Sequence, residues 1–228
     1  MYPIAEYSAI MTNREQLYRF LGRLYRIEID QTLLDHMAGM SFPDGSAEDE
    51  LVEGYRMLEN YLRRPGFDPL TDLAVDYAKV FLGAGVSKDG NAAYPYESVY
   101  TSPEHLIMQD ARDHVLAAYR QKGLEKDAAL DFPEDHIALE LEFMAHLCRE
   151  TQNALASQDW TAVSTGLKEQ NDFLAQHLLN WVPAFCADVL KLARTNFYRA
   201  VARITSGYLT MDLAILEDMT ARPVGDAA

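Results

Sequence analysis

The sequence predicts an all-α protein, built as a single helical domain of about nine or ten helices. Apolar residues recur with the 3.6-residue period of a helix along nearly the whole chain. No run alternates apolar and polar residues for long enough to require a sheet. The chain has 228 residues. A chain of this size buries roughly 70–75% of its unfolded surface, so its core needs no metal or disulfide.

Helix-start and helix-stop signals divide the first third of the chain into four helices. Residues 12–15 (Thr-Asn-Arg-Glu) form a possible capping box that opens the first helix. Asp30 is a suitable cap for a short second helix, and Ser46 for a third. The Arg-Arg-Pro-Gly sequence at residues 63–66 ends the third helix, and a fourth is expected over residues 69–82.

The rest of the chain is also helical after one irregular stretch. Residues 83–95 carry glycines and predict a loop. Pro103 opens a helix that ends near Gly123, and Pro133 suits the first turn of a helix that reaches about Gln152. The remaining helices are expected at residues 157–179, 183–193 and 196–219.

The helical domain is expected to span residues 1–220. Residues 221–228 contain proline and glycine and predict a frayed tail. The link from Gly123 to Asp131 is where two subdomains would join, if the domain is divided.

Composition narrows the class of protein. The net charge is −15, from 35 acidic and 20 basic residues, which opposes nucleic acid binding and suits a basic partner. Residues 1–11 show no secretory signal, and no apolar run reaches 18 residues, so we expect a cytoplasmic protein without a membrane span. Cys148 and Cys186 lack metal-type spacing, which favours buried thiols in a reducing compartment.

The most informative segment is residues 133–136 (Pro-Glu-Asp-His), which places an acid and an imidazole at the start of a mostly apolar helix. In one interpretation the pair is structural: Asp135 complements the helix N-terminus, and His136 bonds to Glu140 one turn later. In the other, the pair belongs to a functional site. A buried charge is costly unless it is paired, so either interpretation needs partners.

A metal site or a catalytic site has little support in the sequence. Di-metal helical bundles use Glu-x-x-His pairs, whereas this chain offers Glu142-x-x-x-His146. The motifs of phosphate-binding loops, serine hydrolases and zinc proteases are absent. We therefore expect no metal, no cofactor and no catalytic residue. The alternatives are a helical-bundle metal protein or enzyme, and an assembly subunit retained in a complex.

Residues 94–100 (Tyr-Pro-Tyr-Glu-Ser-Val-Tyr) form a second notable segment. Three tyrosines within seven residues suit peptide recognition, because each ring offers stiff apolar area with a polar tip. The alternative is a loop that its tyrosines anchor into the core. Tyr77, Val80 and Phe81 lie on the preceding helix, where core packing is the simpler interpretation.

Two further segments stand out beside residues 94–100 and 133–136. They are residues 76–83 (Asp-Tyr-Ala-Lys-Val-Phe-Leu-Gly) and 177–185 (His-Leu-Leu-Asn-Trp-Val-Pro-Ala-Phe). Together the four segments resemble one family, the TorD/DmsD/NarJ-type cytoplasmic chaperones for molybdenum-containing oxidoreductases. The resemblance covers about residues 70 to 210.

The resemblance implies an all-α chaperone that binds the twin-arginine signal peptide of a partner apoenzyme. It would hold a molybdopterin-containing oxidoreductase in the cytoplasm until the cofactor is inserted, and then release it for export. An acidic protein with an apolar groove suits such a leader, which has a basic segment followed by an apolar one. The protein is expected as a monomer or a domain-swapped dimer.

The peptide-binding residues that follow from this resemblance come from three of the segments. Tyr77, Phe81, Pro95, Tyr96 and Tyr100 are expected to shape the apolar part of the site. Asp135, His136 and Glu97 are expected to face the basic or backbone part. The set is completed by Ser98 and Pro133.

Overall fold

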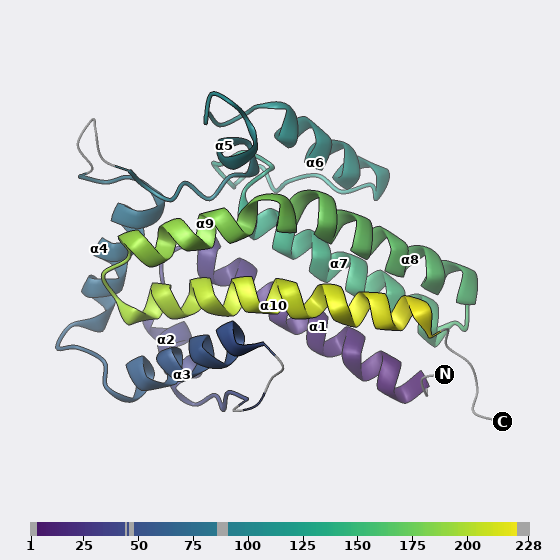
Figure 1. Cartoon of the computed structure of the whole chain (residues 1–228), viewed down its shortest axis with the longest axis horizontal. Helices are drawn as coiled ribbons and strands as arrows, with labels where there is room; N and C mark the ends of the chain where they lie inside the picture. The colour runs from purple at the N-terminus through teal and green to yellow at the C-terminus, as the bar shows by residue number, and fades with distance from the viewer. Residues whose placement is uncertain (1–3, 44, 46–47, 86–90, 223–228) are drawn as a thin grey trace.

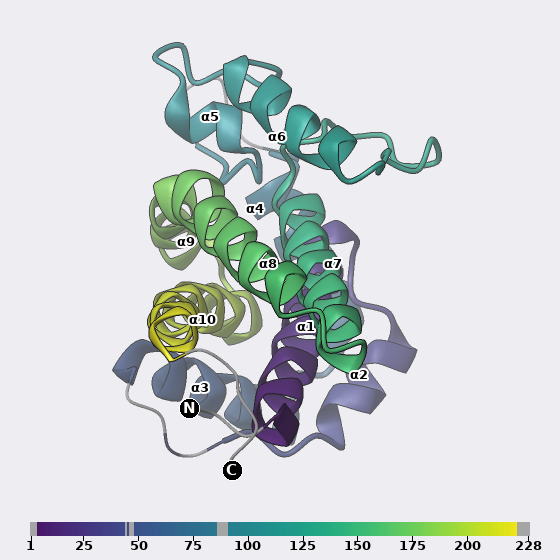
Figure 2. The ribbon, with the colours of Figure 1, turned by 90° about the vertical axis from the view of Figure 1, so that its right-hand side faces the viewer.

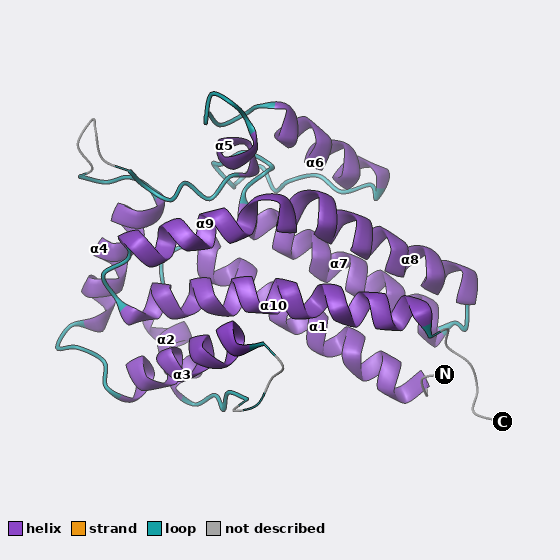
Figure 3. Cartoon of the chain, viewed as in Figure 1, coloured by secondary structure: helices purple, strands orange, loops and turns teal. Residues whose placement is uncertain are grey.

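The computed structural model describes residues 4–43, 45, 48–85 and 91–222 (Figure 1). Within these ranges the chain forms ten α-helices and one π-helical turn, with no β-strand (Figure 3). The α-helices are α1 (Ile4–Arg26), α2 (Gln31–Ala38), α3 (Asp49–Arg63), α4 (Pro69–Phe81), α5 (Glu97–Thr101), α6 (Asp110–Gln121), α7 (Ile137–Ala156), α8 (Trp160–Phe173), α9 (Leu179–Leu192) and α10 (Asn196–Ala221). The predicted all-α class is confirmed.

The long helices form the body of the molecule. Helix α1 packs along α7, α7 packs against α8, and α10 lies between α3 and α9. Helices α5 and α6 lie together on one side of this body, as the views in Figure 1 and Figure 2 agree. The segment that carries α5 and α6 is therefore displayed on a rigid helical platform.

An aromatic cluster fixes α4 to this platform. The Phe81 ring lies 5.1–6.0 Å, between ring centroids, from those of Tyr25, Tyr77, Phe185 and Tyr198. All five side chains are buried. Aromatic pairs at such distances stabilise a core beyond the area that they bury. The cluster joins α4 to α1, α9 and α10.

The predicted start of the first helix is wrong. Helix α1 begins at Ile4, and the Thr12 hydroxyl donates to the Ser8 carbonyl at 2.9 Å within the helix instead of capping it. Tyr7 and Met11 are fully buried, so the apolar face continues past the expected cap. The Asp30 cap is confirmed, since its carboxylate accepts from the Leu33 amide at 2.8 Å. Ser46 lies outside the described residues.

The helix expected from Pro103 is also wrong. Five residues form α5 earlier, and α6 begins only at Asp110. Between them His105 and Met108 have φ angles of 53° and 61°. This left-handed backbone is costly for residues other than glycine and cannot continue a helix.

Helices α8 and α9 are continuous through a π-helical turn, Leu174–Leu178. The expected break at Pro183 is therefore wrong, since α9 begins at Leu179 and contains this proline. The helix continues through Pro183 at the cost of one backbone hydrogen bond, because proline has no amide hydrogen to donate.

Helices α3 and α10 approach so closely that a side chain at Gly207 has no room. A Cβ atom there would lie 2.6 Å from the Leu51 backbone nitrogen. We expect Gly207→Ala to lower the free energy of unfolding by about 1–3 kcal/mol, because overpacking outweighs the better helix propensity of alanine. Urea denaturation measures this effect. Gly39→Ala is the control, since its Cβ would meet atoms only at 3.5 Å or more. Equal stability of the two variants would contradict the prediction.

Candidate functional site

The tyrosine-rich segment and the residues before α7 form one unit, although they are far apart in the sequence. Tyr96 and His136 form an isolated antiparallel bridge. The Ile137 amide donates to the Pro95 carbonyl at 2.9 Å, and the Glu97 amide donates to the Asp135 carbonyl at 3.0 Å. Two of the segments singled out in the sequence are thus joined by backbone hydrogen bonds.

Asp135 and His136 each accept a hydrogen bond from an amide in the first turn of a helix, but not in the way expected. The fully buried Asp135 carboxylate accepts from the Ser98 amide at 2.9 Å, so it serves α5 and not α7. His136 is the N-cap of α7, and its Nδ1 accepts from the Ala138 amide at 3.1 Å. The expected bond from His136 to Glu140 is wrong, because the imidazole is directed back to its own helix start.

Burial lowers the pKa of His136 to about 3. The unfolded chain takes up this proton below about pH 6.5, whereas the folded protein does not. The stability that His136 contributes is therefore complete above pH 6.5. It is lost as the pH falls towards 3, at about 1.4 kcal/mol per pH unit.

We expect His136→Asn to reduce this acid sensitivity. Asparagine keeps an N-cap acceptor but cannot take up the proton. Between pH 6 and pH 4, the free energy of unfolding should fall less steeply in the variant than in the wild type. The difference between the two slopes should be about 1.4 kcal/mol per pH unit. Urea denaturation at several pH values measures both slopes. Identical slopes for the two proteins would show that His136 is not the source of this acid sensitivity.

A cluster of buried polar groups lies behind the bridge. The Trp181 indole donates to the Glu140 carboxyl at 3.0 Å, and Glu140 is fully buried. Burial, and next the nearby Glu97, raise the pKa of Glu140 well above its ordinary value. His177, in the π-helical turn, lies with its Nδ1 at 2.9 Å from the Glu97 carboxylate. Burial raises the pKa of Glu97, and His177 opposes that rise.

Glu97 and His177 also line an open pocket of about 480 Å³. The pocket lies between α5, α6 and the junction of α8 with α9. Its lining residues are Glu97, Thr101, Asp110, Ala111, His114, Gln176, His177 and Asn180. Two carboxylates and no lysine or arginine face this space, so it suits a cationic group.

The segment between α5 and α6 borders the pocket and exposes apolar side chains. Leu106, Ile107 and Met108 are exposed by 57%, 47% and 57%. The segment is held by hydrogen bonds from the Gln109 amide to Ser98 Oγ at 3.1 Å and between His105 Nδ1 and the Val99 carbonyl at 2.8 Å. Three adjacent exposed apolar side chains on a fixed loop offer a contact surface.

The other expected peptide-binding residues are buried or partly buried. Tyr77, Phe81, Pro95, Ser98, Asp135 and His136 are buried, whereas Tyr96, Tyr100 and Pro133 are partly buried. Tyr77 and Phe81 belong to the aromatic cluster, and the Tyr77 hydroxyl donates to the Tyr25 carbonyl at 2.9 Å. Tyr100 stacks on Trp181 with 5.6 Å between ring centroids. Tyr96 lies edge-on to His136 with 5.1 Å between ring centroids, whereas Tyr94 is exposed by 41%. Two of the three tyrosines thus anchor this loop, which supports in part the interpretation that its tyrosines hold it in the core.

The sequence interpretation missed Asp110, His114 and the exposed residues 106–108. These were placed within the helix expected from Pro103. The available signal was the Leu-Ile-Met run, which stands among polar residues without a helical repeat. Its exposure depends on the left-handed residues beside it, which the sequence pattern does not reveal.

Three general findings complete the description. Across the described ranges, no three His, Cys, Asp or Glu side chains converge in an arrangement that would hold a metal ion. None of the helices in the described part of the chain has both the length and the apolar character needed to cross a membrane. Both cysteines are buried, as expected.

The chain is similar in sequence to several known chaperone proteins. It is 29% identical to the chaperone protein TorD of Vibrio cholerae, over 94% of this chain and 96% of that protein. It is 28% identical to TorD of Shewanella pealeana, over 90% of each, and 27% identical to TorD of Vibrio vulnificus, over 91% of this chain and 96% of that protein. The profile of the nitrate reductase delta subunit family matches residues 47–187. That match covers more than half of the 228 residues and confirms the expected relationship, so this chain belongs to the nitrate reductase delta subunit family.

Proposed function

We propose that this protein is a cytoplasmic chaperone, without catalytic activity of its own, for a molybdopterin-containing oxidoreductase. It binds the twin-arginine leader and the apo form of that enzyme while the cofactor is inserted, and it leaves before export. The acidic pocket beside the exposed loop carries the proposal. The names of the relatives, which are chaperones, support the same class of function.

The pocket of about 480 Å³ supports recognition of the leader's arginines. Asp110 is exposed at the start of α6, and the Glu97 carboxylate reaches the same space from α5. A guanidinium forms strong, directional hydrogen bonds with a carboxylate. The net charge of −15 also attracts a basic segment over a longer range.

The loop before α6 supports recognition of the apolar part of the leader. Residues 106–108 lead directly to Asp110, so the apolar and acidic surfaces are continuous along the chain. A leader has the complementary properties in the opposite order, a basic segment followed by an apolar one, so it would lie antiparallel to residues 106–110. Burial of its apolar side chains against Leu106, Ile107 and Met108 would add affinity to the ionic contact.

The buried residues of the expected site act by holding the pocket in shape. Asp135 fixes the Ser98 amide, and Ser98 Oγ accepts from the Gln109 amide directly before Asp110. This series of contacts connects the start of α7 to the start of α6. Asp135 and Ser98 are therefore positioning residues for Asp110.

Co-purification tests the proposal at the level of the client. The tagged protein is expected to retain an apo molybdopterin oxidoreductase that still carries its leader. It should not retain the same enzyme after cofactor insertion or after removal of the leader. If the tagged protein also retains the finished enzyme, it is an assembly subunit instead. If it captures neither form of the enzyme, the proposal is contradicted.

A further inference from the structure

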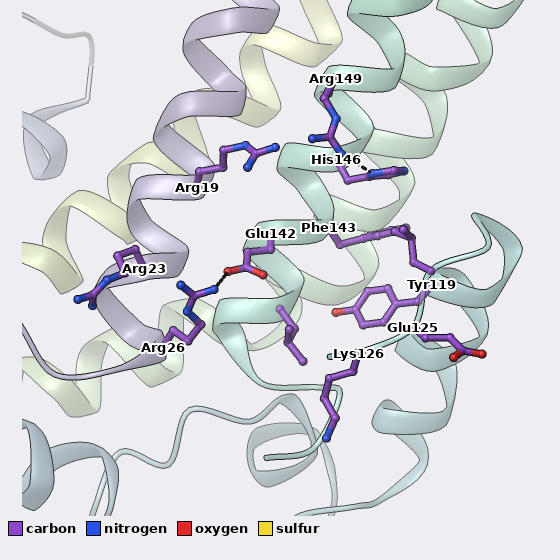
Figure 4. A pocket seen from close by; sticks show the side chains of 12 residues that line it. Arg19, Arg23, Arg26, Tyr119, Glu125, Lys126, Glu142, Phe143, His146 and Arg149 are labelled. Carbon is purple, nitrogen blue, oxygen red and sulfur yellow. Dashed lines mark hydrogen bonds and ion pairs between the residues drawn. The ribbon is translucent and has the colours of Figure 1, made fainter. Parts of the chain in front are cut away.

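A second pocket lies on another face of the molecule, between α1 and α7, and its charge is opposite to that of the protein. Its volume is about 470 Å³. Figure 4 shows Arg19 and Arg26 of α1 directed towards α7, which carries Glu142, His146 and Arg149, with Tyr119 and Lys126 on the other side. The lining residues are Arg19, Arg23, Arg26, Tyr119, Leu124, Glu125, Lys126, Leu139, Glu142, Phe143, His146 and Arg149.

The charge of this pocket is unusual for the chain. Five lining side chains are basic and two are acidic, whereas the whole chain carries −15. A quarter of the chain's 20 lysines and arginines thus lies around one pocket. A concave site with an excess of positive charge attracts anions.

The arginines at one end of the pocket keep hydrogen-bond donors for a ligand. Arg19 is half exposed and pairs with Glu15 of its own helix. Arg149 is exposed, and within the described residues it contacts His146 Nδ1 at 3.2 Å. An imidazole that accepts a hydrogen bond is neutral, so it does not neutralise the charge of the arginine. Surface pairs such as Arg19–Glu15 contribute little and yield readily to a stronger anion.

One wall of the pocket, beside these arginines, is aromatic. Tyr119 and Phe143 are 5% exposed, with 4.8 Å between their ring centroids. His146 lies parallel to Phe143, with an angle of 10° between the rings. Burial raises the pKa of the Tyr119 hydroxyl, so this wall stays uncharged.

The two walls of the pocket are held close together. A Cβ atom at Gly22 would lie 3.2 Å from the Ala138 carbonyl oxygen, so α1 and α7 are in near contact between the arginines. Arg26 Nη1 also donates to Glu142 Oε1 at 2.9 Å across the two helices. A preformed pocket of this size suits a small molecule better than a protein segment.

We propose that this pocket binds a small phosphate ester that carries an aromatic ring. The phosphate would accept hydrogen bonds from Arg19 and Arg149, whose planar guanidinium groups match its oxygens. The ring would lie against the aromatic wall of Tyr119, Phe143 and His146. The site has no signature in the sequence, because its cations come from separate elements and form no phosphate-binding loop.

Calorimetry at low ionic strength with phenyl phosphate and inorganic phosphate tests the proposal. We expect saturable binding of one phenyl phosphate per chain, tighter than inorganic phosphate, because the ring adds contact with the aromatic wall. The double variant Arg19→Gln/Arg149→Gln should weaken phenyl phosphate binding by about tenfold or more. Both side chains are exposed, so the fold should persist, which circular dichroism checks.

The matched control removes two arginines elsewhere. Arg56 and Arg63 are exposed on α3, with side chains exposed by 66% and 69%. Arg56→Gln/Arg63→Gln makes the same change in net charge and should keep wild-type affinity. Absence of saturable binding, or equal weakening in both double variants, would overturn the proposal. Tighter binding of a short oligoglutamate peptide would replace it with an acidic protein segment. Leader binding should not change in Arg19→Gln/Arg149→Gln, so this test is separate from that of the chaperone function.

Discussion

Replacing Asp212 by asparagine is expected to lower the free energy of unfolding by about 3–5 kcal/mol. The Asp212 carboxylate is fully buried and accepts from Arg14 Nε at 2.5 Å and Arg14 Nη2 at 2.8 Å. The Tyr18 hydroxyl donates to it at 2.6 Å. Burial alone would lower the pKa of Arg14, but Asp212 outweighs this and raises it. Without the carboxylate, a guanidinium remains buried without its counter-charge.

Urea denaturation at pH 7 measures this effect. Glu59→Gln is the matched control, because Glu59 forms an exposed pair with Arg63 one turn away and its loss should cost about 0.5 kcal/mol or less. The double variant Arg14→Met/Asp212→Leu should recover much of the lost stability, because it removes both buried charges. A loss in Asp212→Asn no greater than in Glu59→Gln would contradict the assigned role.

Replacing Asp110 by lysine is expected to weaken binding of a twin-arginine leader by at least about tenfold. A hydrogen bond to a charged group contributes about 1.5–3 kcal/mol, and lysine adds repulsion to its loss. Asp110 is exposed, so the substitution should leave the core intact. Calorimetry with a synthetic leader peptide measures the change in affinity.

Asp113→Lys separates the pocket from general charge effects. Asp113 lies in the same first turn of α6, and its carboxylate contacts Arg112 at 3.3 Å outside the pocket lining. Both variants change the net charge equally and disturb the helix dipole in the same turn. Leader affinity should therefore fall much less in Asp113→Lys. Equal losses would assign the effect to net charge and not to the pocket.

Most helices could be predicted from the sequence because their signals are local. Asp30 caps α2, Asp68 caps α4 directly before Pro69, and Asp159 caps α8, each by a hydrogen bond within three residues. Apolar periodicity then gives the buried face of each helix. Such signals need no knowledge of distant contacts.

The segment from α5 to the start of α7 could not be predicted because its contacts are distant. Asp135 holds the Ser98 amide across 37 residues, so the carboxylate at the start of one helix serves another. The local pattern of Pro133 suggested an earlier helix start than the His136 cap that the structure has. Resemblance brought the right segments together, but it did not indicate which side chains are buried.

The burial of Arg14 could have been predicted from its position in the helical pattern, but the capping-box interpretation concealed it. It lies on the same helical face as Tyr7, Met11 and Tyr18, all of which are buried. A charged residue at such a position requires a buried partner. The capping-box interpretation placed it in a first turn, where no partner is needed.

Leader binding tests the central claim most directly. Calorimetry of the wild-type protein with the leader of a molybdopterin oxidoreductase is compared with the same peptide in which both arginines are glutamine. We expect saturable binding of one leader per chain, weakened by about tenfold or more without the arginines and also weakened by added salt. No binding of the leader, or equal affinity for the two peptides, would contradict the account.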